Sequence, residues 1–198
     1  MKQFLFFSVL YFLFTFNCRA TDEYATGYFI TKSNDTIMCK ILIQKDFGHF
    51  NEQSFFLKVT ISDSAGHKKK YTPQDINGYA FVYHDKGYIY VSRQVDEDGR
   101  RLFLWPLNLG KKINEYYYYN YNTSDLDKGA MGSMNEVYVL EDAETKETVA
   151  ITKGGSLSNS YKAQLRKFFE ADKKIMALLV QDVKEFHDIY RFVKDSNN

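Results

Sequence analysis

Residues 26–152 form a succession of short segments in which every second residue is apolar, and turn-forming residues separate these segments. A period of two places alternate side chains on opposite faces of an extended strand, so the pattern is typical of antiparallel β-strands with one buried face. We expect about eight to ten strands. In the strand predicted over residues 35–44, one face carries Ile37, Cys39, Ile41 and Ile43.

Turn-forming residues locate the hairpins. Ser33-Asn34 joins the first two predicted strands, and asparagine tolerates the left-handed conformation that a tight turn requires. A second hairpin is predicted across Asp85-Lys86-Gly87. The residues from Thr72 to Asp75 predict a single helical turn capped by Thr72. We interpret Lys68-Lys69-Lys70 as a solvated turn rather than a binding patch.

The pattern changes after Gly154-Gly155, where apolar residues begin to recur every three or four positions, as in an amphipathic helix. This stripe needs a sheet or another helix to cover it, and we expect Phe168 or Phe169 to anchor it in the core. The sequence therefore predicts an α+β fold, with a twisted antiparallel sheet or partial β-barrel and C-terminal α-helices packed against it. Strands are predicted over about 26–152 and helices over about 158–195, in one β-rich domain of residues 21–198.

Residues 1–20 have the features of a secretory signal peptide. Lys2 precedes an apolar run from Phe4 to Phe16, and Cys18 and Ala20 occupy the positions where signal peptidase requires small residues. A run of about 13 residues is too short to cross a hydrocarbon core of ~30 Å. We therefore expect cleavage after Ala20 and export to the periplasm, the cell envelope or the medium, with no transmembrane span. Lipid attachment at Cys18 is the less favoured alternative.

The expected mature chain is nearly neutral and has one cysteine. Cleavage would leave 24 basic and 25 acidic residues, because the first twenty residues contain two of the 26 Lys and Arg residues and no acid. This balance does not indicate a nucleic-acid partner. Cys39 would be the only cysteine, which excludes an intramolecular disulfide, and its place on an apolar strand face predicts a buried, unreactive thiol.

Aromatic residues provide the candidate contact site. Five of the six residues from Tyr116 to Tyr121 are tyrosines. On a strand, Tyr116 and Tyr118 would occupy one face and the other three the opposite face, so we expect one set to pack and the other to lie at the surface. The residues that we consider for contact with a ligand or partner are Tyr117, Tyr119, Tyr121 and Trp105.

No motif indicates catalysis, a metal or a cofactor. The four histidines have no metal-site spacing, and the acidic turns at 96–99 and 125–129 lack the alternating oxygen ligands of a calcium loop. The segment around Ser156 lacks the Gly-x-Ser-x-Gly elbow of serine hydrolases. We therefore predict no cofactor and no metal, and the sequence identifies no catalytic residue.

Two segments resemble a known group of sequences. Gly-Tyr-Phe-Ile and Asn-Asp-Thr-Ile occur within residues 27–37, and residues 71–79 are Tyr-Thr-Pro-Gln-Asp-Ile-Asn-Gly-Tyr. These segments, together with the apolar stripe of 165–193, resemble uncharacterised exported proteins of Bacteroidota-type bacteria. Asn34 and Cys39 stand where that group usually has glycine. The resemblance implies an exported, β-rich protein and supplies no activity.

We therefore expect an exported protein that is not an enzyme and that has a binding or structural role, with a protein, a glycan or an apolar small molecule as its partner. Two alternatives remain open at this point. One is a closed barrel that carries a small apolar ligand, and the other is a hydrolase with a site assembled from distant residues. An internal apolar pocket would favour the carrier, a cleft with convergent acids the hydrolase, and an exposed aromatic patch the contact protein.

Overall fold

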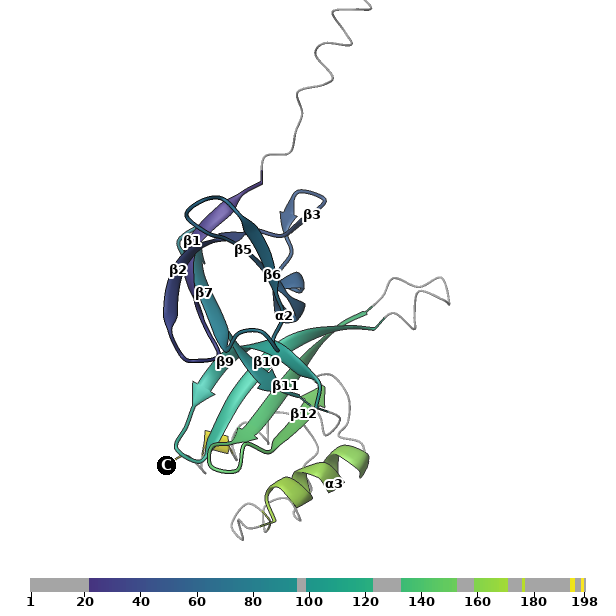
Figure 1. The fold of residues 1–198 in the computed structure, drawn as a ribbon. Helices are drawn as coiled ribbons and strands as arrows, with labels where there is room; N and C mark the ends of the chain where they lie inside the picture. Colours follow the sequence, from purple (N-terminus) through teal and green to yellow (C-terminus); the bar gives the residue numbers. More distant parts are fainter. Residues whose placement is uncertain are drawn as a thin grey trace, which may run out of the picture.

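The computed structural model describes residues 22–95, 99–122, 133–152 and 159–170, together with residues 176, 193, 194 and 197. The predicted signal peptide lies outside this part of the chain. Ten of the described strands form one antiparallel sheet, in the order β12-β11-β10-β9-β8-β7-β1-β2-β5-β6 (Figure 1). The strands of this sheet are β1 (Tyr24–Ile30), β2 (Thr36–Leu42), β5 (Val59–Ser62), β6 (Lys68–Tyr71), β7 (Gly78–Tyr83), β8 (Lys86–Gln94), β9 (Arg101–Leu109), β10 (Ile113–Asn122), β11 (Ser133–Asp142) and β12 (Thr148–Thr152). Strands β3 (Lys45–Asp46) and β4 (His49–Phe50) form a separate hairpin.

The turns follow the conformations that their residues allow. Asn34 has a φ of 68°, as predicted for the turn between β1 and β2. The β7–β8 turn differs from the prediction, because it consists of His84 and Asp85, with φ values of 48° and 61°, and Lys86 already pairs with Tyr83. A two-residue turn with two positive φ values matches the right-handed twist of the strands, which explains why the shorter turn forms.

Two short segments also differ in detail from the sequence prediction. The residues after Thr72 form a hydrogen-bonded turn rather than a helical one, and the Asp75 carboxylate accepts hydrogen bonds from the Thr72 N–H and Oγ1, both at 2.7 Å. Lys68, Lys69 and Lys70 belong to β6, at one end of the sheet, and not to a turn. The three lysines pair with Thr60, Ile61 and Ser62 of β5. This pairing satisfies backbone N–H and C=O groups, which explains why the segment is an extended strand.

The sheet curls around a short helix, α2 (Ser54–Leu57) (Figure 1). The curled part runs in sheet order from β9 through β8, β7, β1, β2 and β5 to β6, and it encloses an aromatic core. Phe55 and Phe56 of α2 are fully buried. The Tyr79 hydroxyl donates to the Phe55 carbonyl oxygen at 2.6 Å, which joins the helix to β7. Aromatic rings that pack together in this core include those of Tyr79, Phe81, Tyr88, Tyr90 and Phe103.

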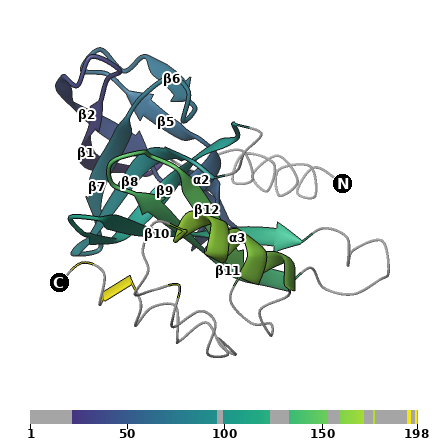
Figure 2. The same cartoon turned by 90° about the horizontal axis from the view of Figure 1, so that it is seen from below.

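A second, smaller cluster lies under the helix α3 (Asn159–Phe168), which covers the β11–β12 end of the sheet (Figure 2). Leu165 and Phe169 are buried there against Ile113, Leu140 and Ile151. Phe169 is thus the core anchor expected from the apolar stripe, and Phe168 is only partly buried. Most of the predicted helical segment beyond residue 170 lies outside the described residues.

The predicted α+β class is wrong, because the described structure is mostly β. Its helices are α2, with 4 residues, and α3, with 10. The sequence prediction assumed that helices must cover the apolar face of the sheet. The curl of the sheet and the two phenylalanines of α2 cover most of that face instead, and only a strip on β10 to β12 is left for α3. Among the described residues, no helix has the length and hydrophobicity to cross a membrane.

Cys39 lies on the predicted strand face and is half-buried rather than fully buried. Burial on this face decreases along β2, from a fully buried Ile41 to an exposed Ile37. Partial burial still raises the pKa of the Cys39 thiol to about 11, because the thiolate is poorly solvated there. The thiol is therefore protonated at neutral pH.

Candidate functional site

The structure brings together three of the four aromatic residues that the sequence singled out. Trp105 on β9 lies opposite Tyr117 on β10, with ring centroids 6.0 Å apart, and the Tyr117 and Tyr119 rings are 5.6 Å apart. Nothing is described of the Tyr121 side chain. We call the side of β10 that carries Glu115, Tyr117 and Tyr119 the open face.

The opposite side of β10, which we call the closed face, carries Tyr116 and Tyr118, and both are buried. Tyr117 and Tyr119 are only half-buried. The predicted packed set is therefore Tyr116 and Tyr118, whereas Tyr117 and Tyr119 are half-buried rather than at the surface as predicted. The accessible set also packs partly on α2, because the Phe56 ring lies 6.2 Å from Tyr117 and 5.8 Å from Tyr119.

A pocket of about 610 Å³ opens beside Tyr119. Its walls come from the β3–β4 hairpin, the segment before α2, and strands β10 and β11. Its lining residues are Asp46, His49, Phe50, Asn51, Glu52, Gln53, Tyr119 and Glu136. We call it the acidic pocket, because these residues include three carboxylates and neither lysine nor arginine. Sequence reasoning did not identify any of the three carboxylates.

Two carboxylates, Asp46 and Glu52, lie on the hairpin side of the acidic pocket, and Glu52 is the more buried of the two. Burial raises the pKa of its carboxyl above the ordinary value, although the nearby Lys86 ammonium and the Tyr117 hydroxyl act in the opposite direction. The Tyr117 hydroxyl donates to Glu52 Oε1 at 3.5 Å, at the limit of a hydrogen bond. Lys45, at the base of the hairpin, forms an ion pair with Glu23. The charge of the Glu52 carboxylate is therefore only weakly compensated.

Two buried side-chain polar atoms on β8 and β10 have no hydrogen-bond partner, and among the described residues they are the only such side-chain atoms. One is the hydroxyl of Tyr90, whose ring packs 5.8 Å from that of Trp105. Burial raises the pKa of Tyr90 well above its ordinary value, and the nearby Glu52 raises it further. The other is Oε2 of Glu115, whose carboxyl pKa is also raised by burial. Such groups cost free energy in the folded state.

The aromatic rings beside the pocket already hold one cation. The Lys86 ammonium lies 5.2 Å from the ring centroid of Trp105 and 4.9 Å from that of Tyr88. Aromatic faces attract cations through their quadrupole, and the attraction is stronger where water is excluded. The open face thus combines negative charge with accessible aromatic rings.

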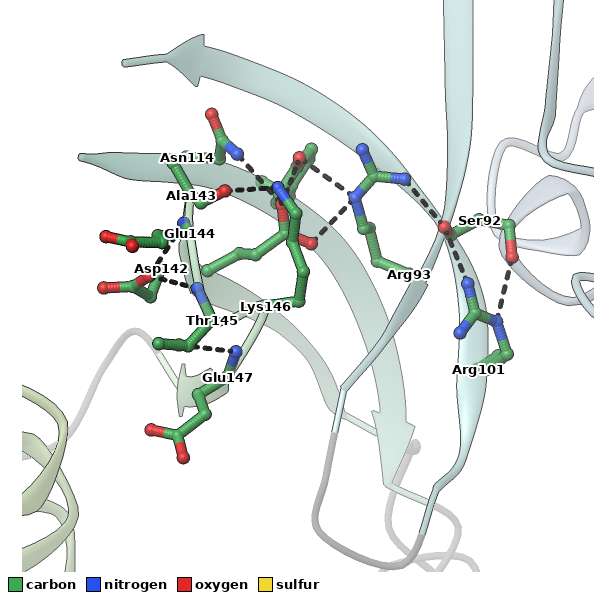
Figure 3. A network of polar contacts seen from close by, with 12 residues as sticks. Ser92, Arg93, Arg101, Asn114, Asp142, Ala143, Glu144, Thr145, Lys146 and Glu147 are labelled. Atoms are coloured by element: carbon green, nitrogen blue, oxygen red, sulfur yellow. Dashed lines mark hydrogen bonds and ion pairs between the residues drawn. The ribbon is translucent and has the colours of Figure 1, made fainter. Parts of the chain in front are cut away.

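The closed face carries a saturated polar network instead (Figure 3). Glu141 on β11 is 3% exposed, and its oxygens bind Arg93 Nε at 2.9 Å, Asn114 Nδ2 at 2.9 Å and the Tyr116 hydroxyl at 3.2 Å. Arg93 Nη1 also donates to the Ser92 carbonyl oxygen at 2.9 Å. These contacts join β8, β10 and β11, and we assign them a structural role.

A second pocket, of about 640 Å³, lies between β12, the neighbouring strands and α3. Its charged lining residues are Arg100, Lys146, Glu147 and Lys167, so its net charge is opposite to that of the acidic pocket. Arg100 Nη2 lies 3.5 Å from the Tyr118 hydroxyl, and Lys146 Nζ donates to the Ala143 carbonyl oxygen. These side chains are engaged within the protein.

No family model, curated protein or solved structure matches this chain. Within the described ranges, no group of three or more His, Cys, Asp or Glu side chains is arranged to hold a metal ion. The chemistry of the acidic pocket therefore has to be inferred from its own residues.

Proposed function

We propose that this protein is a non-enzymatic binding protein whose acidic pocket holds a cationic group of its partner, either an ammonium or a guanidinium. The observation that carries the proposal is the lining of the pocket, where Asp46, Glu52 and Glu136 surround an accessible aromatic ring and neither lysine nor arginine is among the lining side chains. Opposite charge and an aromatic face are the two features that recognise such cations.

The half-buried Glu52 gives the strongest physical reason for a cationic ligand. Its ionised form is poorly solvated, as its raised pKa indicates, so a cation that enters the pocket stabilises a charge that the protein alone stabilises poorly. A charge-assisted hydrogen bond contributes ~1.5–3 kcal/mol, and a cation over the Tyr119 ring ~0.5–2 kcal/mol. Both contributions fall as salt is added, because the pocket is open to solvent.

The carrier alternative has less support. Its apolar ligand would need space inside the curled part of the sheet, and the buried rings of Phe55, Phe56 and Tyr79 fill that region. The hydrolase alternative has one observation in its favour, because the pocket is a cleft with convergent carboxylates. In that second candidate function, Glu52 with its raised pKa would donate a proton and a second carboxylate would activate water.

Trp105, the single tryptophan, provides a direct test because its fluorescence reports on the neighbouring Tyr117 and Lys86. We expect titration with N-acetyl-lysine amide to change this fluorescence saturably. Glu52→Gln should weaken the affinity by about tenfold, which corresponds to ~1.4 kcal/mol. Glu144→Gln, which removes the same charge from the exposed β11–β12 turn, is the matched control and should change affinity less than about twofold.

Equal effects of the two variants would mean that net charge alone attracts the ligand, and would contradict the proposal. Turnover of nitrophenyl glycosides or esters that Glu52→Gln abolishes would favour the hydrolase instead.

Export is part of the same proposal and rests on the pattern of residues 1–20. N-terminal sequencing of the protein secreted by its host should find Thr21 as the first residue. An acylated N-terminal Cys18 would make the protein a lipoprotein and would contradict the predicted cleavage site.

A further inference from the structure

The β3–β4 hairpin presents an exposed phenylalanine at its tip. Phe47 and Gly48 form the two-residue turn between Asp46 and His49, with φ values of 48° and 82°. Phe47 is 96% exposed, more than any other large apolar side chain among the described residues. Its ring therefore contributes almost nothing to the core.

Phenylalanine is also a poor residue for this backbone conformation. Two-residue turns with two positive φ values favour Asn-Gly or Asp-Gly, and a bulky residue in the left-handed region is an outlier. The β7–β8 turn offers a comparison within the same molecule, because its positive φ values belong to His84 and Asp85, which tolerate this region better. A residue that is both strained and unburied is typical of a functional position.

The hairpin that carries Phe47 is tied to the aromatic core through Phe50. The Phe50 ring packs against Phe55, Tyr83 and Tyr88, with centroid distances of 5.4, 5.3 and 5.0 Å. The base of the hairpin is thus anchored in the aromatic core, while Asp46 and His49, on either side of the tip, line the acidic pocket. Phe47 itself does not line the pocket but lies next to its hairpin wall.

We propose that Phe47 is an anchor for a protein partner, whose segment presents apolar side chains next to the lysine or arginine that enters the acidic pocket. This inference rests on the proposed function and names the class of partner. Charge favours a protein over a membrane surface, because anionic lipid headgroups would be repelled by Asp46, Glu52 and Glu136. Exposed aromatic residues held on a rigid element are frequent hot spots of protein interfaces.

The test compares two probes on the full chain. One is a pentapeptide with blocked ends in which leucine and lysine alternate, and the other is N-acetyl-lysine amide, which has the cation alone. Phe47→Ala and Phe47→Asn should each weaken peptide affinity by at least about fivefold and leave the affinity for N-acetyl-lysine amide unchanged. Phe47→Asn should also raise Tm, because asparagine suits the turn, so the loss of binding cannot result from unfolding.

The outcomes separate the two proposals. Unchanged peptide affinity in both Phe47 variants, while Glu52→Gln weakens both probes, would overturn the anchor and keep the pocket. No effect of Glu52→Gln on either probe would overturn the pocket and, with it, the anchor. The last measurement is binding of the protein to vesicles of phosphatidylcholine and phosphatidylglycerol. If they bind the protein through Phe47 while the peptide does not, the hairpin is a membrane contact and the protein-partner inference is wrong.

Discussion

The two faces of β10 carry the same residue type in two different environments. On the closed face, the Tyr116 hydroxyl donates to Glu141 and accepts from Arg93 Nε at 3.1 Å. On the open face, the Tyr117 hydroxyl has a long contact with Glu52 and a hydrogen bond with the Tyr119 side chain, and the nearby Tyr90 hydroxyl has no partner. One face satisfies its buried polar groups and the other does not.

This difference distinguishes stabilising polar groups from those available to a ligand. A saturated network fixes neighbouring strands and leaves nothing for another molecule to bind. Unsatisfied or weakly compensated groups cost stability, and they persist where binding requires them. The contrast therefore predicts that substitutions on the closed face reduce stability, whereas those on the open face change binding.

The largest effect is expected for Glu141 on the closed face. Glu141→Ala removes the partner of Arg93 and should lower the free energy of unfolding by ~2–4 kcal/mol, below the upper limit for a broken buried ion pair because Arg93 is itself 33% exposed. Urea melts would measure this change. Glu136→Ala, on the same strand but on the open face, is the control and should cost less than ~1 kcal/mol. Similar losses from both variants would remove the distinction between the faces.

The adjacent tyrosines allow a finer comparison. Tyr116→Phe deletes a hydroxyl with two charged partners and should cost ~1–3 kcal/mol. Tyr117→Phe deletes a hydroxyl with a long contact to Glu52 and a hydrogen bond to the neutral Tyr119 side chain, and should cost less than ~1 kcal/mol. Thermal or urea unfolding of the two variants would measure both values, and a larger loss for Tyr117→Phe would contradict our assignment of the faces.

Tyr90→Phe should have the opposite sign. Its hydroxyl is buried without a partner, so its removal should stabilise the free protein by ~1 kcal/mol. The measurement is again the urea midpoint, without any ligand. A destabilised variant would show that the hydroxyl has a partner in solution, such as a buried water, and that the open face is more saturated than the structure indicates.

The pH dependence of binding should give the smallest effect. Burial raises the pKa of Glu52 above its ordinary value of 4.5, so a proton competes with the cation for this carboxylate in mildly acidic solution. Affinity for N-acetyl-lysine amide should therefore increase as pH rises from 4.5 through the raised pKa, by a few-fold. In Glu52→Gln this increase should disappear, and its persistence would assign the proton to another group.

The sequence predicted local features better than distant ones. Alternation correctly placed Ile41 on a buried face and separated Tyr116 from Tyr117, and Asn34 correctly located a turn, because these properties depend on neighbouring residues. The helical stripe around Leu165 led to the wrong fold class, because the sequence does not show that the sheet curls over its own apolar face. Hydrophobic periodicity indicates which side is covered but not what covers it.

The site was predicted only in part for a related reason. Tyr117 and Tyr119 were identified because five tyrosines are close together in the sequence. Glu52 lies 65 positions from Tyr117, and the two meet only because the sheet curls around α2. Glu136 lies beside Tyr119 through the register of β10 and β11. That register depends on where both strands begin, which alternation does not determine.

The three lysines of β6 have a consequence for how molecules of this protein behave when they are crowded together. Edge strands expose unpaired backbone groups and can add strands from other molecules, which is a common start of aggregation. Two copies that paired through β6 would bring their lysine rows side by side, and the repulsion between ammonium groups would oppose such a contact. Lys68, Lys69 and Lys70 therefore oppose the addition of further strands at β6, which is one edge of the ten-stranded sheet. In this way they disfavour the growth of fibres from that edge.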